Sequence, residues 1–339
     1  MKKYLLPKEG NFYKANMHMH TTISDGKMTP EETKEAFLKE GYSIVAFTDH
    51  EIMVPHPELT DENFIALTSV EISINERRNI PFIFTKTYHL NLYSKDPNKT
   101  TYNCFDKSIL WLDKAKEYAT KEQMDIQYDR VYTVDCINEM IEMSKKEGFF
   151  VSLNHPAWSL QNYTDYINLK GLWGVEWHNS TCVGMGYSDT ITPIDDLLRV
   201  GENVFPLATD DAHKKEDCFG GFLMVKAPEL KYDIVYDALA RGDFYSSEKP
   251  LINELYIEDG IIHINTSKAK KIIVSADKRY TCPVIASEGE YLTDTDININ
   301  WFLERCNSKI NEYEYIRITV VDEDGNIAYT RAYSINELK

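Results

Sequence analysis

The chain has 339 residues, 43% of them hydrophobic and 27% charged, which is enough to bury a large core. Its formal net charge of −17 at pH 7 argues against broad binding to nucleic acid, which requires clustered Lys and Arg. The six cysteines are scattered without a Cys-x-x-Cys pair, as is typical of reduced thiols in a cytosolic protein. Because no apolar run resembles a signal peptide or approaches the ~18 residues that span a bilayer, we expect a cytoplasmic protein.

Strand-like and helix-like segments alternate from the start of the chain to about residue 248. Strands are expected over residues 15–20, 43–48, 65–70, 88–93, 149–153, 172–177 and 204–208. A capping box at Thr29-Pro30-Glu31-Glu32 opens a helix that Gly41 ends, a second helix runs from about 133 to 147, and a third opens at Thr192. This alternation predicts a parallel sheet or barrel. Residues 75–130 are less regular and are interpreted as an insertion, a candidate substrate lid.

The pattern changes after Pro250 to short segments of alternating hydrophobicity. Strands are expected over residues 254–257, 261–264, 271–275 and 297–301. The clearest signal is a hairpin of residues 315–320 and 327–332 around an Asp-Gly turn. About ninety residues of this kind predict a small all-β sandwich, so we place one domain at 1–248 and a second at 249–339.

Metal-ligating residue types recur at the ends of the predicted strands. His18 and His20 are two residues apart, as are Asp211 and His213, and in an extended strand such side chains share a face. Further ligand types at or between strand ends are Asp25, His50, Glu71, His89 and His155. Because strand C-termini gather on one face of a (β/α) barrel, the sequence predicts a multinuclear metal centre there.

The motifs His18-Met-His20, Thr48-Asp49-His50, Asn154-His155-Pro156 and Asp211-Ala-His213, with Asp25, Glu71 and His89, resemble the PHP (polymerase and histidinol phosphatase) superfamily in type and order. The resemblance covers roughly residues 10–248. The C-terminal β-domain resembles the accessory domain of some stand-alone bacterial members. The resemblance implies a distorted (β/α)7 TIM-like barrel that binds two or three divalent metal ions.

Carried over position by position, the resemblance implies three overlapping sites. The ligands would be His18, His20, Glu71 and Asp211 for the first metal, Glu71, His89 and His155 for the second, and Asp25, His50 and His213 for the third. His56 and His178 compete with His89 for its place. Some members have His where this chain has Asp25, and a carboxylate there favours Mn²⁺, Fe²⁺ or Mg²⁺ over Zn²⁺.

The expected nucleophile is a hydroxide formed from a water that bridges two metals and is held by Glu71, His155 and Asp211. No other side chain is assigned a catalytic role. The imidazole ligands are expected to have hydrogen-bond acceptors, and the candidate acceptors are the neighbours Asp49, Asp210 and Asn154. Four basic residues either bind a distal anion of the substrate or are solvated charges: Arg77, Arg78, Lys214 and Lys215.

The leading hypothesis is a metal-dependent phosphoesterase acting on a small phosphorylated metabolite or nucleotide, with no nucleic acid or membrane as partner. The alternative is an amide, carbamate or carboxylic ester hydrolase that uses the same centre. A proofreading exonuclease is disfavoured by the acidic balance, and a binding module with a degenerate centre is disfavoured because no expected ligand is missing. The substrate, the native metal, the oligomeric state and the role of the β-domain stay open at this level.

Overall fold

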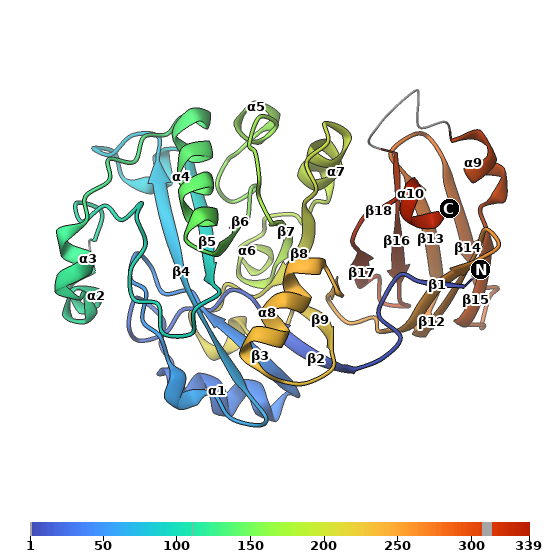
Figure 1. Cartoon of the computed structure of the whole chain (residues 1–339), viewed down its shortest axis with the longest axis horizontal. Coiled ribbons are helices and arrows are strands. Elements are labelled where there is room, and N and C mark those ends of the chain that lie inside the picture. The colour runs from blue at the N-terminus through green and yellow to red at the C-terminus, as the bar shows by residue number, and fades with distance from the viewer. Residues whose placement is uncertain (1, 111, 307–313) are drawn as a thin grey trace.

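The computed structural model describes residues 2–110, 112–306 and 314–339 and shows a mixed α/β fold with a large sheet (Figure 1). Up to residue 146 the elements are β1 (Lys3–Tyr4), β2 (Asn11–Asn16), α1 (Pro30–Lys39), β3 (Tyr42–Phe47), η1 (Pro57–Leu59), β4 (Ile65–Asn75), η2 (Phe82–Phe84), β5 (Thr87–Ser94), α2 (Asp113–Tyr118), α3 (Lys121–Asp125) and α4 (Val134–Lys146). From there to residue 247 they are β6 (Phe149–Leu153), α5 (Tyr163–Tyr166), β7 (Gly174–Asn179), α6 (Ser180–Gly184), α7 (Thr192–Arg199), β8 (Phe205–Thr209), η3 (Lys215–Asp217), β9 (Phe222–Ala227), α8 (Tyr232–Arg241) and β10 (Phe244–Ser247). The C-terminal elements are β11 (Ile252–Glu258), β12 (Ile261–Ala269), β13 (Lys271–Ala276), β14 (Thr281–Ile285), β15 (Leu292–Asn298), α9 (Asn300–Arg305), β16 (Tyr315–Val321), β17 (Ile327–Thr330), β18 (Tyr333–Ser334) and α10 (Ile335–Leu338).

The large sheet follows the order β14-β13-β16-β17-β10-β9-β2-β3-β4-β5-β6-β7-β8. Strands β2, β3 and β4 are parallel, as are β6, β7 and β8, but β5 is antiparallel to both of its neighbours. The expectation of a parallel sheet is therefore wrong at β5. The antiparallel direction of β5 follows from the short connection of residues 76–86 that joins it to β4. A chain that returns beside its preceding strand without a crossover must run antiparallel. The segment 75–130 thus contributes one strand to the sheet and is not wholly irregular.

Strand β4 is longer than the predicted 65–70 and is buried over ten of its eleven residues. Its first half pairs with β3, and its second half pairs with β5 from Ser69 to Asn75. Glu71 consequently lies inside a strand, with backbone pairing on both sides, and not beyond the end of one. A buried strand of this kind holds its side chains in fixed positions.

Two backbone hydrogen bonds join the segments that follow β2 and β8. The amide of His20 donates to the carbonyl of Ala212 at 3.0 Å, and the amide of Asp211 donates to the carbonyl of His18 at 3.0 Å. The strands β2 and β8 themselves are not paired among the described ladders, which form an open path. The two ends of the β2–β8 series therefore meet at their C-terminal tips, where the candidate ligands lie.

Local sequence signals explain where the main helices begin. The Thr29 hydroxyl accepts a hydrogen bond from the Glu32 amide and the Glu32 carboxylate accepts one from the Thr29 amide, which confirms the predicted capping box. Thr133 caps α4 in the same way through the Cys136 amide. Thr192 was expected to cap α7, but it is the first helical residue, and its amide donates to the Thr190 hydroxyl.

Seven of the C-terminal strands belong to two sheets that share one hydrophobic core. Strands β11, β12 and β15 form a four-stranded sheet with β1, and β13, β14, β16 and β17 extend the large sheet. The shared core includes Leu255, Ile262, Val274 and Ile318. The predicted hairpin is present, with Val321 opposite Ile327. The predicted strand 297–301 ends early at Asn298, whose side chain accepts from the Asn300 amide before α9 begins.

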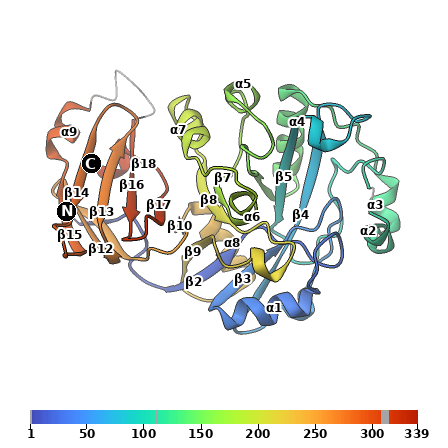
Figure 2. The ribbon, with the colours of Figure 1, turned by 180° about the vertical axis from the view of Figure 1, so that it is seen from behind.

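An arginine of the C-terminal strands binds a helix of the β2–β8 part. Arg317 on β16 donates from Nε to Asp195 Oδ1 at 2.9 Å and from Nη2 to Asp195 Oδ2 at 2.8 Å. Asp195 lies in α7, and both views place that helix beside these strands (Figures 1 and 2). The side chains are only 10% and 15% exposed, so this paired contact is shielded from water. Within the described residues, no helix is long and apolar enough to cross a membrane.

The substitution Asp195→Ala is expected to lower the free energy of unfolding by about 3 kcal/mol, because it leaves the Arg317 guanidinium buried without its partner. Chemical denaturation measures this change. The matched control is Asp237→Ala on the exposed face of α8, which is expected to change the free energy by less than about 0.5 kcal/mol. Equal effects of the two variants would show that the pair does not stabilise the fold.

Candidate metal centre

Nine side chains from distant parts of the chain meet at one end of the β2–β8 strands: seven follow the C-terminal ends of strands, Glu71 lies inside β4, and His89 lies near the start of β5. They are the nine predicted ligands: His18, His20, Asp25, His50, Glu71, His89, His155, Asp211 and His213. Their ligand atoms fall into three overlapping groups, and within each group these atoms lie within 4.8 Å of one another. The structure thus brings together every residue that the sequence patterns selected for this site.

The first group is completely buried and contains His18, His20, Glu71 and Asp211. Asp211 Oδ1 lies 3.2 Å from His18 Nε2 and 3.0 Å from His20 Nε2. Glu71 approaches the same two rings from the other side, at 3.3 and 3.4 Å. Two imidazole nitrogens and two carboxylates therefore point at one small volume.

The second group joins Glu71 to His89 and His155. Glu71 Oε1 lies 3.0 Å from His89 Nδ1 and 3.3 Å from His155 Nε2. His89 reaches this point because β5 runs antiparallel beside β4. The competing residues lie elsewhere, since His56 contacts Glu58 and His178 contacts Asp189.

The third group contains Asp25, His50 and His213, and His20 also borders it. Asp25 lies 3.5 Å from His213 Nε2 and 3.6 Å from His50 Nε2. The turn that brings Asp25 back requires Gly26, because a Cβ there would lie 2.3 Å from the carbonyl oxygen of His20. About 30% of the Asp25 and His213 side chains is exposed, so this group faces solvent.

The charges of the centre favour ionised carboxylates. Burial raises the pKa of Glu71, Asp211 and Asp25, but the surrounding imidazoles outweigh it and leave all three pKa values lowered. Burial lowers the pKa of His50, but Glu71 and Asp25 outweigh it and raise this pKa to about 9. By contrast, burial and the neighbouring His213 and His50 lower the pKa of His20 to about 4.

The donor set fits divalent cations. The His20 Nδ1 and Asp211 Oδ1 atoms are buried, and neither makes a hydrogen bond of suitable geometry in the described part of the chain, although Asp211 Oδ1 lies 3.0 Å from His20 Nε2. Such atoms are costly to bury unless a ligand satisfies them. Six imidazoles with three carboxylates form a mixed nitrogen and oxygen set that suits Mn²⁺, Fe²⁺ or Zn²⁺. His155 and Asp211 also have positive φ values of 29° and 52°, a strained backbone that is concentrated at functional sites.

No family model and no curated protein matches this chain. Among solved structures it is similar to a two-domain protein from Bacteroides vulgatus that contains a PHP-like metal-dependent phosphoesterase, with 14% identity, a TM-score of 0.45 and 98% of each chain covered. It is similar to a metal-dependent phosphoesterase from Bifidobacterium adolescentis, with 17% identity, a TM-score of 0.39 and coverage of 70% of this chain and 98% of that one. It is also similar to an amidohydrolase from Chromobacterium violaceum, with 16% identity, a TM-score of 0.37 and coverage of 60% and 89%.

The first of these structures is named for the superfamily that the motifs resemble.

Glu176 on β7 contacts two of the candidate ligands and was not predicted from the sequence. Its Oε1 accepts from His18 Nδ1 at 2.7 Å and from the Thr209 hydroxyl at 2.8 Å. Its Oε2 accepts from the His155 amide at 2.9 Å and from the Asn179 amide group at 3.0 Å. Glu176 therefore orients a candidate ligand of the first group and fixes the backbone of one in the second. A carboxylate inside the apolar strand predicted at 172–177 was the signal that could have found it.

The three neighbours expected to orient ligands divide into two kinds. Asn154 contacts a ligand as a donor and not as the imidazole acceptor that was expected, because its side-chain amide donates to Glu71 Oε1 at 2.9 Å. Asp49 accepts from the amides and hydroxyls of Thr21 and Ser24. Asp210 accepts from the amides of residues 219–221 and from Ser180. The two aspartates therefore hold loops and do not contact imidazoles, since backbone amides already occupy their oxygens.

A buried ion pair fixes the loop that carries His50. Arg130 Nη1 donates to Glu51 Oε2 at 2.7 Å, and both side chains are almost completely buried. The other oxygen of Glu51 accepts from the Ser73 amide on β4 at 2.8 Å. Glu51 has a φ of 62°, a strained conformation that this pairing holds in place. The segment 75–130 thus supports the centre through Arg130.

The four basic residues predicted to bind an anion lie on the surface. Arg78 is paired with Asp106 and Asp129, and Lys214 lies 3.8 Å from Asp217. Lys214 and Lys215 follow His213, so they are near the solvent-facing third group. Binding of substrate by Arg77, Arg78, Lys214 or Lys215 stays a prediction.

Added Mn²⁺ is expected to stabilise the metal-free protein, because metal binds the folded centre and not the unfolded chain. At a free concentration of about 100 times its Kd, one site raises the free energy of unfolding by about 2.7 kcal/mol. Denaturation with and without EDTA measures this shift, and Asp211→Asn is expected to reduce it. An unchanged midpoint after Mn²⁺ addition would contradict the metal centre.

The substitution Glu176→Gln is expected to weaken Mn²⁺ binding by about 10–100-fold, because it removes the charge that orients His18. Competition with a chelator of known affinity measures the change. The exposed Glu122 on α3 offers the matched control, since Glu122→Gln is expected to leave affinity unchanged. If both variants bind metal like the parent protein, Glu176 has only a structural role.

Proposed function

We propose that this protein is a metal-dependent phosphoesterase that hydrolyses a small phosphorylated metabolite or nucleotide. The observation that carries the proposal is the position of Glu71. Its two oxygens lie 3.0 to 3.4 Å from nitrogens of five histidines: His18, His20, His50, His89 and His155. One carboxylate that is shared by two ligand groups and lies 3.1 Å from His50 of the third is an arrangement that can hold several cations close together.

The charge balance favours an anionic substrate. The carboxylates of the centre are Asp25, Glu71, Asp211 and Glu176, and three divalent cations carry more positive charge than these four residues neutralise. A phosphoryl group offers three oxygens to such a surplus, whereas an amide or ester carbonyl offers one. This difference supports phosphoester hydrolysis over the amide, carbamate or ester alternative.

Each of three cations would be held by one of the ligand groups. His18, His20, Glu71 and Asp211 would hold the first cation, and Glu71, His89 and His155 the second. Asp25, His50 and His213 would hold the third. When bound, the cations would lower the pKa of a coordinated water and neutralise charge on the phosphoryl oxygens. Glu176, Asn154 and the Arg130–Glu51 pair keep the ligands in place before substrate arrives.

In the reaction, the oxygen of water forms a bond to phosphorus, and the bond from phosphorus to the leaving alcohol breaks. The leaving oxygen takes up a proton, and inorganic phosphate is released from a monoester. The buried first group shields one side of this reaction from bulk water. The third group leaves the other side open to solvent.

We propose further that β2 to β8 form the distorted seven-stranded barrel that the resemblance implies, with the link between His18–His20 and Asp211–Ala212 as its point of closure. The β-rich part from residue 249 would be an accessory domain. The net charge of −17 supports a small soluble substrate in the cytoplasm rather than nucleic acid or a membrane.

Protein reconstituted with Mn²⁺ is expected to release phosphate from one or more members of a panel of phosphomonoesters and nucleotides. Loss of a residue that only supports a metal ligand lowers activity by roughly 10–100-fold. His155→Ala removes a proposed ligand itself, so it is expected to lower the rate of phosphate release by more than that. His263→Ala on β12, where the ring contacts Asp296, is the matched control and is expected to keep full activity.

Absence of phosphate release from every compound, with bound metal confirmed, would overturn simple phosphomonoesterase activity. Release of an amine or carboxylic acid from an amide or ester panel would then support the alternative hydrolase.

A further inference from the structure

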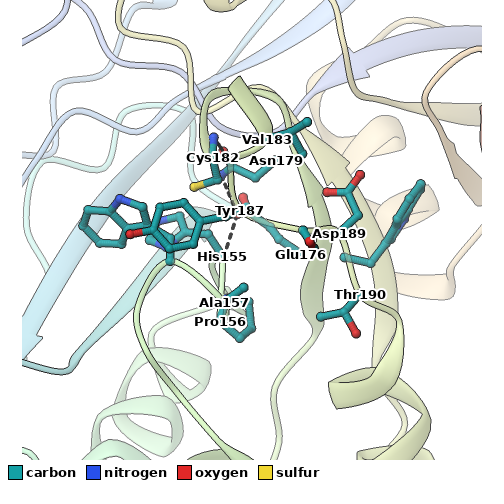
Figure 3. Close-up of a pocket in the computed structure, with 13 residues that line it drawn as sticks. His155, Pro156, Ala157, Glu176, Asn179, Cys182, Val183, Tyr187, Asp189 and Thr190 are labelled. Atoms are coloured by element: carbon teal, nitrogen blue, oxygen red, sulfur yellow. Dashed lines mark hydrogen bonds between the residues drawn. The ribbon is translucent and has the colours of Figure 1, made fainter. Parts of the chain in front are cut away.

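A further cluster of metal-ligating side chains lies outside the candidate metal centre. It contains His178 at the end of β7, Asp189 in the loop between α6 and α7, and Glu248 directly after β10. Asp189 Oδ2 lies 2.7 Å from His178 Nδ1, and Glu248 Oε1 lies 3.5 Å from the same nitrogen. This His178 cluster shares no residue with the three ligand groups of the centre. Figure 3 shows Asp189 and His155 on opposite sides of Glu176, so the cluster is a separate site.

The backbone fixes the His178 ring in its position. The pairing of β7 with β8 shifts its register between Glu176 and His178, and an irregularity of this kind re-aims a side chain. The ring lies against Gly221, where a Cβ would be only 2.8 Å from the His178 Cδ2 atom. His178 is 5% exposed. A buried and closely packed imidazole therefore presents its Nδ1 atom to the two acids.

The hydrogen bonds of Ser180 determine which nitrogen of the ring carries a proton. The Ser180 hydroxyl has one proton, and it donates to Asp210 Oδ1 at 2.8 Å or to the Thr209 carbonyl at 3.2 Å. Its oxygen therefore accepts from His178 Nε2, which lies 3.2 Å away. With Nε2 protonated, Nδ1 of the neutral ring offers a lone pair on the side of the carboxylates. Metal-binding histidines are commonly held in this way, by a hydrogen bond from the other ring nitrogen.

The acids of the cluster lack a matching positive charge. Within the described residues, neither Asp189 nor Glu248 forms an ion pair with Lys or Arg. Burial and the charges of Asp189 and Asp322 raise the pKa of Glu248. A proton on His178 Nδ1 would pair with Asp189, but Glu248 Oε1 would still accept no hydrogen bond from the described part of the chain. A divalent cation would contact all three ligand atoms at once.

We propose that His178, Asp189 and Glu248 bind one further divalent cation through Nδ1 and one oxygen of each acid. One imidazole with two carboxylates suits Mn²⁺, Fe²⁺ or Zn²⁺, since Mg²⁺ and Ca²⁺ take mainly oxygen ligands. The Glu248 amide donates to the Ile327 carbonyl at 3.0 Å, and Glu248 Oε2 accepts from the Ile327 amide at 2.7 Å. The cation therefore joins β7 and the α6–α7 loop to β17 among the C-terminal strands.

Titration with Mn²⁺, followed by the electron paramagnetic resonance signal of the free ion, counts the ions that each chain binds. The titration is made at pH 8, where protons compete less for His178. Asp189→Asn and Glu248→Gln are each expected to bind one Mn²⁺ fewer than the parent protein. The matched control is Asp125→Asn at the exposed end of α3, which is expected to bind the same number as the parent protein. Equal numbers in the parent protein and both cluster variants would overturn the inference, and the acids would then hold only a protonated His178.

The Asp211→Asn variant separates this inference from the proposed function. It alters the first ligand group and leaves the His178 cluster intact, so it is expected to bind one Mn²⁺ more than the double variant Asp211→Asn/Asp189→Asn. Occupation of this site is also expected to slow amide hydrogen exchange around Ile327 in the single variant only, because Glu248 binds that backbone.

The two proposals fail in distinguishable ways. A difference of one ion between the single and double variants, without phosphate release from any ester by the parent protein, would support this site and overturn the phosphoesterase. Phosphate release by the parent protein, with equal ion numbers in the single and double variants, would support the phosphoesterase and overturn this site.

Discussion

The centre of this protein depends on the burial of one carboxylate among imidazoles. A buried Glu is unfavourable unless charges and hydrogen bonds compensate for lost water. Glu71 is 1% exposed, and five histidines and the Asn154 amide surround it. Its position on β4 matters because that strand pairs in parallel with β3 and antiparallel with β5. Because β5 runs antiparallel to β4, His89 lies next to the same carboxylate that faces His18 and His20.

The loops around the centre are held by acids that accept backbone amides. Asp49 fixes the segment that leads to Asp25, Asp210 fixes residues 219–221, and Glu176 fixes the amide of His155. These contacts restrain a backbone that is strained at His155 and Asp211. The surrounding fold therefore keeps the ligand atoms close to one another, and such preorganisation reduces the cost of binding.

Local sequence patterns predicted much of the fold, and the predictions that were wrong have physical causes. The Thr29 capping box, the buried strand at 149–153 and the hairpin after Tyr315 were predicted because neighbouring residues decide them. The antiparallel direction of β5 was not predicted, because side-chain periodicity is the same in parallel and antiparallel strands. The early end of β15 depends on the Asn298 side chain, and such a turn competes with strand extension in a way that hydrophobicity does not reveal.

The sequence alone determined which residue types form the centre and their order along the chain. Histidines and acids after predicted strands point to metal binding, because strand ends converge in α/β folds. Only the tertiary structure decided which atoms lie together. Glu176 contacts a histidine 158 positions away, and His20 borders two groups rather than one. The proximity of His178, Asp189 and Glu248 was also invisible in the sequence, because these residues come from separate elements. Distances of this kind depend on strand order and direction, which spacing along the chain does not encode.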